Sequence, residues 1–382
     1  MQKHYEIQEK PKKAFLVSIL NNETGGGESM SVEFRGLAES LGLEIAVHEK
    51  IRVREKTAKF GMGSGKAAEL AQKATDLKTD CMVFDWNPTP SQQRNWEELS
   101  GIPVVDRQEL IIRIFAERAN TREAELQVKL AELSYRLPRL THKYIDLSRQ
   151  RGGRYGTKGS GETKLETDRR LIEKRIRQLE KDIEDVRKQR QTQRRQRERQ
   201  GLPVCAIVGY TNAGKSSLLN ALTGADVLAE DKLFVTLDAV TRRFQPAPGV
   251  PVLLTDTVGF IRQLPHSLIK AFRSTLEEAA LADILIHILD ASEVDIDSCC
   301  ETTFSVLKEL GAPLATKFPA QDIPMITVLN KIDCLNNYET IQELQNRYPD
   351  SIAVSAKNGT GLEMLKNRIA ERLKEIKSSH ID

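Results

Sequence analysis

The spacing of hydrophobic and polar positions changes twice along the chain and divides it into three segments. In the first segment, residues 1–118, short apolar runs that end at turn residues alternate with amphipathic stretches. Such runs predict strands, and alternation with helices predicts a small parallel α/β layer. We expect strands at 13–20, 43–49, 81–86 and 103–106. We expect helices near 31–41, 66–76, 91–99 and 107–118.

The second segment, residues 119–200, repeats apolar residues at steps of four and three. The repeating positions are Leu126, Leu130, Leu133, Leu137 and Leu140, and then Ile172, Ile176, Leu179, Ile183 and Val186. Two heptad stretches separated by a loop predict an antiparallel helical hairpin.

The loop of this hairpin, residues 152–162, is rich in glycine and carries Arg154 and Lys158. A connector between helices needs only about two to eight residues. We therefore favour a contact role for this loop over that of a plain connector.

Residues 187–200 contain seven Arg or Lys and one Glu. Such a run either binds phosphate or an acidic partner, or is a solvated helix end. The pattern does not separate these alternatives.

The third segment, residues 201–382, begins with an apolar run that stops at Gly209 and is followed by GYTNAGKS. This motif fits the phosphate-binding loop G-x-x-x-x-G-K-[ST], flanked by an expected strand and helix. Gly214 allows close backbone approach, Lys215 neutralises phosphate, and the Ser216 hydroxyl suits magnesium. The glycine-rich segment 61–66 lacks this spacing, so we reject it as a phosphate loop.

Two further segments complete a magnesium and phosphate site. Asp256 ends an apolar strand, where a carboxylate coordinates magnesium, usually through water. The backbone N–H of Gly259 is placed to sense the terminal phosphate. In the segment 233–244, Thr236 is our candidate for closing over that phosphate, and Thr241 is the alternative.

The run NKID at 330–333 indicates which base is bound. One carboxylate, Asp333, can accept both the N1–H and the N2 amine of guanine, whereas adenine offers neither donor. Asn330 can brace the phosphate loop, and the Lys331 stem can pack on the base. Residues Ser355, Ala356 and Lys357 form a loop that can meet the guanine O6.

Composition bears on how the chain could bind nucleic acid and on the cellular compartment in which it works. The formal net charge is only +3 and aromatic residues make up 5%, so base stacking on aromatic side chains is not expected to dominate. The five cysteines lack C-x-x-C spacing, which fits a reducing cytoplasm without zinc or disulfides. We expect no signal peptide and no insertion in a membrane.

These motifs, together with GTKGSGETKLETDRR at 156–170 and DTVGFIRQLPHSLIKAFRSTLEE at 256–278, closely resemble the HflX family over the whole chain. The resemblance implies an α/β P-loop GTPase domain with a parallel sheet, preceded by a small α/β domain and an antiparallel helical hairpin. It implies a cytoplasmic GTP hydrolase that uses Mg²⁺ and binds the large ribosomal subunit and its rRNA, with a role in splitting or rescuing stalled ribosomes under stress. A monomer fits this mechanism.

Carried over by position, the resemblance assigns roles to individual residues. It assigns catalytic roles to Lys215, Thr236 and Gly259. It assigns magnesium binding to Ser216 and Thr236, with Asp256 acting through water. Contacts with GTP or GDP fall on Gly209, Tyr210, Thr211, Asn212, Ala213, Gly214, Lys215, Ser216, Phe234, Val235, Thr236, Leu237, Asp238, Asp256, Thr257, Val258, Gly259, Asn330, Lys331, Ile332, Asp333, Ser355, Ala356 and Lys357.

One position departs from Ras-type switches, which place a water-orienting Gln after the glycine of this motif. Here that position is Phe260. We therefore expect slow hydrolysis by the protein alone and activation on the ribosome.

Two alternatives stay open. The chain could be a nucleotide-gated RNA-binding module not tied to ribosomes. The N-terminal domain could also be a separate enzyme, although Asp85 and Asp106 at strand ends are more simply explained as turn or capping residues.

Overall fold

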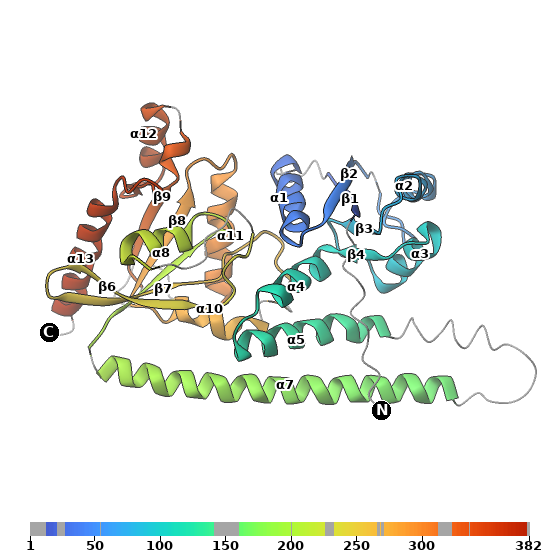
Figure 1. The fold of residues 1–382 in the computed structure, drawn as a ribbon, viewed down its shortest axis with the longest axis horizontal. Coiled ribbons are helices and arrows are strands. Elements are labelled where there is room, and N and C mark those ends of the chain that lie inside the picture. Colours follow the sequence, from blue (N-terminus) through green and yellow to red (C-terminus); the bar gives the residue numbers. More distant parts are fainter. Residues whose placement is uncertain are drawn as a thin grey trace, which may run out of the picture. The chain divides into compact units, whose positions relative to one another are not determined.

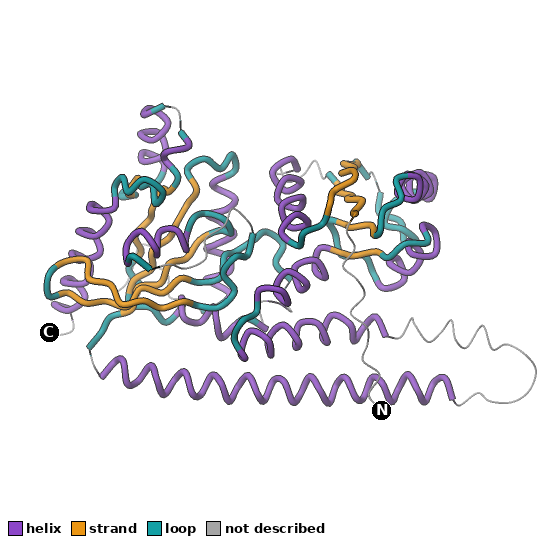
Figure 2. Tube along the Cα trace, viewed as in Figure 1, coloured by secondary structure: helices purple, strands orange, loops and turns teal. Residues whose placement is uncertain are grey.

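The structure is a computed structural model that describes residues 13–20, 27–53, 55–140, 160–199, 201–225, 233–265, 268, 271–311, 323–335 and 337–379. Contacts divide it into two compact units. The first unit comprises residues 1–117 and 129–178, and the second comprises residues 118–128 and 179–382. The helices and strands of both units are shown in Figure 1 and by class in Figure 2.

The first unit contains a four-stranded parallel sheet of order β2-β1-β3-β4. Its strands are β1 (Lys13–Ile19), β2 (Glu44–Ile51), β3 (Cys81–Phe84) and β4 (Val104–Asp106). Its helices are α1 (Gly27–Ser40), α2 (Ser64–Asp76), α3 (Pro90–Ser100) and α4 (Arg107–Arg118). Each predicted strand and helix of the N-terminal α/β layer is therefore present, with ends shifted by a few residues.

Local sequence accounts for the ends of α3. Thr89 and Gln92 form a capping box in which each side chain accepts from the other residue's backbone N–H, at 3.2 and 2.9 Å. Gly101 ends the helix in the left-handed region at φ 72°, which is the usual role of a C-terminal glycine. Trp96 on this helix is fully buried against the sheet, and its Nε1 donates to the carbonyl of Phe60 at 3.0 Å.

The carboxylates of Asp85 and Asp106 are committed to structural contacts. Asp85 pairs with the buried Arg107 at 2.6 Å. Asp106 accepts from the Glu109 backbone N–H at 2.7 Å and from Arg139 at 2.7 Å. Burial raises the pKa of both carboxyls to about 6, against the opposing effect of these partners.

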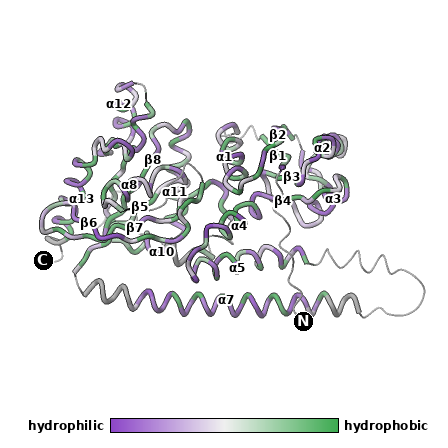
Figure 3. The backbone as a smooth tube through the Cα atoms, viewed as in Figure 1, coloured by the Kyte–Doolittle hydropathy of each residue, from purple (hydrophilic) through white to green (hydrophobic). Residues whose placement is uncertain are grey.

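The helices predicted as a hairpin are α5 (Arg122–Arg136), continued by the short 3₁₀ turn η1 (Leu137–Arg139), and α7 (Ser160–Arg199). Figure 3 shows hydrophobic residues recurring between hydrophilic ones over the coloured middle part of α7. The Arg190 guanidinium of α7 lies 2.8 Å from the Glu123 carboxylate of α5, a contact between opposite helix ends that an antiparallel pair requires. Of the predicted glycine loop, residues 152–159 lie outside the described residues, and Ser160 already begins α7.

The second unit contains a six-stranded sheet of order β10-β9-β8-β5-β7-β6. The strands are β5 (Val204–Gly209), β6 (Val240–Ala247), β7 (Val250–Asp256), β8 (Ile284–Asp290), β9 (Met325–Asn330) and β10 (Ile352–Ala353). The expected sheet was parallel, but the edge strand β6 is antiparallel to β7. Only a tight turn at Gly249, with φ 75°, joins these two strands, and a parallel pair would need a much longer crossover.

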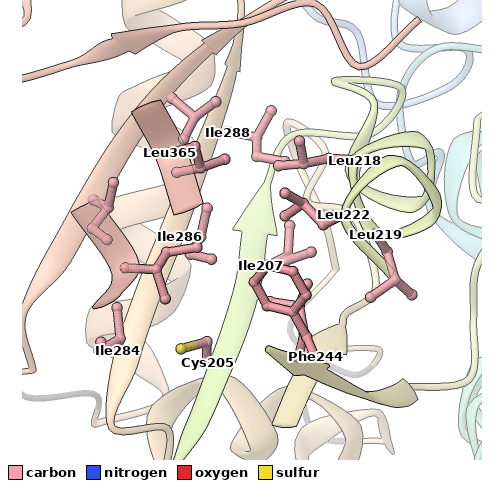
Figure 4. Packing of buried hydrophobic residues seen from close by; sticks show 14 of the residues in the cluster. Cys205, Ile207, Leu218, Leu219, Leu222, Phe244, Ile284, Ile286, Ile288 and Leu365 are labelled. Atoms are coloured by element: carbon pink, nitrogen blue, oxygen red, sulfur yellow. The ribbon is translucent and has the colours of Figure 1, made fainter. Parts of the chain in front are cut away.

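Helices cover both faces of this sheet. They are α8 (Lys215–Thr223), α10 (Arg273–Ala280), α11 (Ile296–Glu309), α12 (Tyr338–Arg347) and α13 (Leu362–Ser379), with a 3₁₀ turn η2 (Ile332–Cys334). Ile286 and Ile288 of β8 pack with Leu218 of α8 and Leu365 of α13 in one core cluster (Figure 4). The alternate residue His287 faces Phe304 of α11, with ring centroids 5.3 Å apart. Strand alternation thus places one apolar set under each helical layer.

No helix among the residues that the structure describes is long and apolar enough to cross a membrane.

Candidate functional site

The phosphate loop lies between β5 and α8, and two glycines fix its path. A Cβ on Gly209 would lie 2.4 Å from the carbonyl oxygen of Ile288. A Cβ on Gly214 would lie 2.2 Å from Nδ2 of Asn330, and Gly214 adopts φ 91°. The sequence explains Gly214 by close approach to phosphate, whereas the structure adds a nearer reason, the space that Asn330 occupies.

Lys215 points back over the loop, and its Nζ donates to the Tyr210 carbonyl at 2.6 Å. Burial lowers the pKa of its ammonium to about 8; Asp256 opposes this shift and Lys331 adds to it. An anion bound in the loop would favour the charged form of this lysine.

Three oxygen-bearing side chains meet at the start of α8. The Ser216 hydroxyl donates to Asp256 Oδ2 at 2.6 Å and lies 2.7 Å from the Thr236 hydroxyl. The other oxygen of Asp256 is buried, with no hydrogen-bond partner among the described residues. Burial raises the pKa of this carboxyl, and Lys215 opposes that shift. Hard oxygen donors with one unused buried carboxylate oxygen fit Mg²⁺.

Thr236, and not Thr241, is the threonine beside Ser216. Thr241 belongs to β6, and its hydroxyl pairs with that of Thr255 at 3.0 Å. Gly259 faces the same site, because a Cβ there would lie 2.7 Å from Lys215 Nζ. The three residues predicted to act in catalysis therefore share one cavity, whose walls are Thr211, Asn212, Gly214, Lys215, Ser216, Ser217, Phe234, Val235, Thr236 and Gly259.

Phe260 holds the loop that follows Asp256 against the phosphate loop. Its N–H donates to the Gly209 carbonyl at 3.1 Å, and its carbonyl accepts from the Thr211 N–H at 2.7 Å. Its side chain is 1% exposed. An apolar, buried ring cannot orient a water molecule, so another group must do so.

The base-recognition segments converge on Asn330. Its Nδ2 donates to the Ala213 carbonyl at 2.9 Å, and its Oδ1 accepts from the Ala356 N–H at 3.0 Å. Asp333 Oδ1 accepts from the Ser355 hydroxyl at 2.5 Å. Asn330 thus ties the phosphate loop to the two loops expected around guanine.

Several predicted contact residues direct their side chains elsewhere. The Thr257 hydroxyl donates to the Ile207 carbonyl at 2.7 Å, and Val258 and Leu237 are buried. The Tyr210 hydroxyl accepts from the Arg262 N–H at 2.8 Å. For these residues, contact with a nucleotide stays a prediction about the backbone. Lys357 is exposed on its loop, and Ile332 begins η2.

Sequence reasoning missed two partners of the site. Asp290 Oδ2 lies 2.8 Å from Lys331 Nζ. Asp290 ends the apolar run 284–290, which was a usable signal in the sequence, and it lies opposite Asn330 in the sheet. The Asp238 carboxylate accepts from the Asn120 N–H at 3.3 Å and from the Thr121 hydroxyl. Because residues 120 and 121 precede Asp238 by 118 and 117 positions, no local pattern could have revealed this contact.

The chain is similar to known GTPases along its length. Three family models match consecutive parts of the chain. They are described as GTP-binding GTPase N-terminal (residues 28–116), GTP-binding GTPase Middle Region (118–197) and 50S ribosome-binding GTPase (204–331).

Similar proteins named GTPase HflX occur in several bacteria. The protein of Akkermansia muciniphila is 46% identical over 341 residues, which cover 86% of this chain and 76% of that protein. The protein of Escherichia coli K12 is 40% identical over 363 residues, covering 95% and 83%. Among solved structures, the complex of SsGBP with GDP covers 96% of this chain and 99% of its own, at 26% identity and a TM-score of 0.52.

Proposed function

Because this chain belongs to the HflX family of GTPases, we propose that it binds the large ribosomal subunit and that the subunit activates its GTP hydrolysis. The chain is a GTP hydrolase by its family. The proposal extends to the splitting or rescue of stalled ribosomes under stress, in the cytoplasm and as a monomer. The match of residues 204–331 to the 50S ribosome-binding GTPases supports the choice of partner.

The observation that carries the catalytic part is the meeting of Ser216, Thr236 and Asp256 within 2.7 Å hydrogen bonds. These residues would hold Mg²⁺, Ser216 and Thr236 directly and Asp256 through water. Bound there, the ion would neutralise charge that builds up on the phosphate oxygens. Asp256 orients the Ser216 hydroxyl, and its buried second oxygen is available to an outer-shell water.

The protein's own groups supply the rest of the electrostatic stabilisation. Lys215 sits in a buried loop, where its positive charge acts on phosphate with little screening. Gly259 lines the same cavity, and its backbone N–H is the expected donor to the terminal phosphate. What the site lacks is a polar side chain at Phe260 to orient water, so turnover by the isolated protein should be slow.

A nucleotide-gated RNA-binding module remains the second candidate, and the basic run on α7 would serve either candidate. The basic side chains of this run that the structure describes already have acidic partners. Arg187 pairs with Glu277 at 2.8 Å, Lys188 with Asp185 at 3.6 Å, and Arg190 with Glu123 at 2.8 Å. These three of the seven basic side chains in the run therefore have acidic partners within the chain, and binding to large subunits compared with other structured RNA separates the two candidates.

The test is GTP turnover with and without large ribosomal subunits, in the wild type, Lys215→Ala and Lys66→Ala. Lys66 is a matched control, because it also follows a glycine-rich segment but pairs with Glu69 on α2. We expect subunits to raise GTP turnover of the wild type and of Lys66→Ala by about tenfold or more. We expect Lys215→Ala to show no GTP turnover, with or without subunits.

Unchanged turnover with subunits would remove the ribosome from the proposal and leave the GTPase assignment intact. Salt-dependent binding to any structured RNA, without preference for the large subunit, would then favour the RNA-binding module.

A further inference from the structure

We propose that Thr121, at the start of α5, is a positioning residue for GTP hydrolysis that acts through Asp238 on Thr236. This inference rests on the role of Thr236 in the proposed function. It adds a part of the chain that none of the nucleotide-binding motifs contains.

Both oxygens of the Asp238 carboxylate are held by the two residues before α5. Oδ1 accepts from the Thr121 hydroxyl, and Oδ2 accepts from the Asn120 backbone N–H at 3.3 Å. The Thr121 oxygen also accepts from the Ala124 N–H at 3.2 Å, so this hydroxyl caps α5 as well. The positive end of the helix adds to the attraction for a carboxylate.

Asp238 is only two residues from Thr236 in the loop that carries it. Between them, Leu237 is 2% exposed, and Phe234 on the other side is also 2% exposed. The loop is therefore fixed by two buried apolar side chains and by the Asp238 carboxylate. Within that frame, the Thr236 hydroxyl lies 2.7 Å from Ser216. Release of Asp238 would free one of the three anchors and let Thr236 move away from Ser216.

The start of α5 is itself held in place. Glu123 is 6% exposed and pairs with Arg190 of α7 at 2.8 Å. Arg190 also lies 3.8 Å from Glu278 of α10, the helix that follows the Asp256 motif. Ion pairs with α7 and α10 thus hold the N-terminus of α5 in place, and Thr121 at that end is a fixed contact for the loop that carries Asp238.

The consequence is specific for the chemical step. Thr236 would contact the magnesium ion and terminal phosphate only with GTP, so loss of the Thr121 contact should lower kcat and spare GDP affinity. Loss of an interaction that is made only in the reacting complex lowers kcat without changing the affinity for the product.

The experiment separates positioning of the loop from capping of the helix. Thr121→Ala removes both contacts. Thr121→Asp keeps a good capping group but sets a second carboxylate against Asp238. Thr121→Ser keeps both contacts. Thr89→Ala is the matched control, because the Thr89 hydroxyl also caps a helix, accepting from the Gln92 N–H at the start of α3.

Steady-state GTP turnover and GDP affinity are measured for each full-length variant, with thermal unfolding as a check of folding. We expect Thr121→Ala and Thr121→Asp to lower kcat by about tenfold, with GDP affinity within about twofold of wild type. Thr121→Ser and Thr89→Ala should keep wild-type kcat. A Thr121→Ala, Asp238→Ala double variant should lose no more than Asp238→Ala alone.

Wild-type kcat in Thr121→Asp would overturn the inference and leave only a helix cap. Thr236→Ala is measured alongside to tell the two failures apart. If Thr236→Ala lowers kcat and Thr121→Asp does not, only the role of Thr121 is wrong. If Thr236→Ala keeps wild-type kcat, the proposed role of Thr236 is wrong, and the inference falls with it.

Discussion

The side-chain amide of Asn330 donates to the carbonyl of Ala213 at 2.9 Å and so joins the end of β9 to the phosphate loop. The amide fits there because residue 214 has no side chain. Base recognition and phosphate binding therefore share one hydrogen bond, and a change on either side of it should disturb both.

Gly214→Ala tests this relationship. The new Cβ would lie 2.2 Å from Asn330 Nδ2, at φ 91°, so Asn330 must move and the loop must distort. We expect GTP and GDP affinities to fall by about a hundredfold or more, measured by equilibrium titration.

Gly224→Ala is the control for Gly214→Ala. Gly224 also has positive φ, at 68°, but an added Cβ there meets nothing within 4 Å. It should cost stability through backbone strain alone and leave nucleotide affinity near wild type. Equal losses in the two variants would argue against the clash with Asn330.

Asp333→Asn should change which base is bound. Asn keeps an acceptor for N1–H but presents a donor where the guanine N2 amine also donates. We expect GTP affinity to fall by about a hundredfold, with a gain for xanthosine triphosphate, whose O2 accepts from that donor.

Competition between the two nucleotides measures the change in base preference. Asp350→Asn serves as the matched control, since it is exposed and its φ of 63° suits Asn equally well. Unaltered base preference in Asp333→Asn would exclude Asp333 as the base-reading group.

Ser216→Ala should remove the dependence of nucleotide binding on magnesium. The variant loses the hydroxyl that lies 2.6 Å from Asp256 and 2.7 Å from Thr236. We expect kcat to fall by about a hundredfold, and nucleotide affinity to become insensitive to chelation of the ion. Thr223→Ala, at the other end of the same helix, removes a hydroxyl that donates to the Leu219 carbonyl at 2.7 Å and should behave as wild type in both assays. A Ser216→Ala enzyme that still needs magnesium would place the ion elsewhere.

His287 should make the second unit sensitive to acid. Burial lowers the pKa of its imidazole to about 4, and the unfolded chain has the ordinary value of about 6.5. Below pH 6.5 the unfolded state therefore binds the proton and the folded state does not, so stability falls as the pH drops toward 4. We expect this group to cost about 2 kcal/mol between pH 7 and pH 5.

His287→Leu removes the titrating group and should lose less stability over the same range. Urea unfolding followed by circular dichroism measures the difference in stability. Tryptophan fluorescence would report on the first unit instead, because both tryptophans, Trp86 and Trp96, belong to it. The same pH dependence in both proteins would show that His287 does not titrate as described.

The sequence by itself determined the two α/β sheets and the chemistry of the nucleotide site. Strand and helix periods are local properties, and the phosphate loop and NKID follow from the shape and charge of the ligand. Ser216, Asp256 and Asn330 could be chosen in this way because each ends or follows a strand at a fixed spacing. The resemblance to the HflX family rested on these motifs together with residues 156–170 and 256–278.

Only the tertiary structure decided which long-range partners these residues have. It placed Thr236 beside Ser216 and Thr241 on β6, a choice that local sequence leaves open. It also showed that β6 is antiparallel to β7, that Lys331 pairs with the Asp290 carboxylate, and that the Thr121 hydroxyl donates to Asp238. Such contacts depend on how separate elements pack, and the free energy of packing is spread over many residues that no short motif contains.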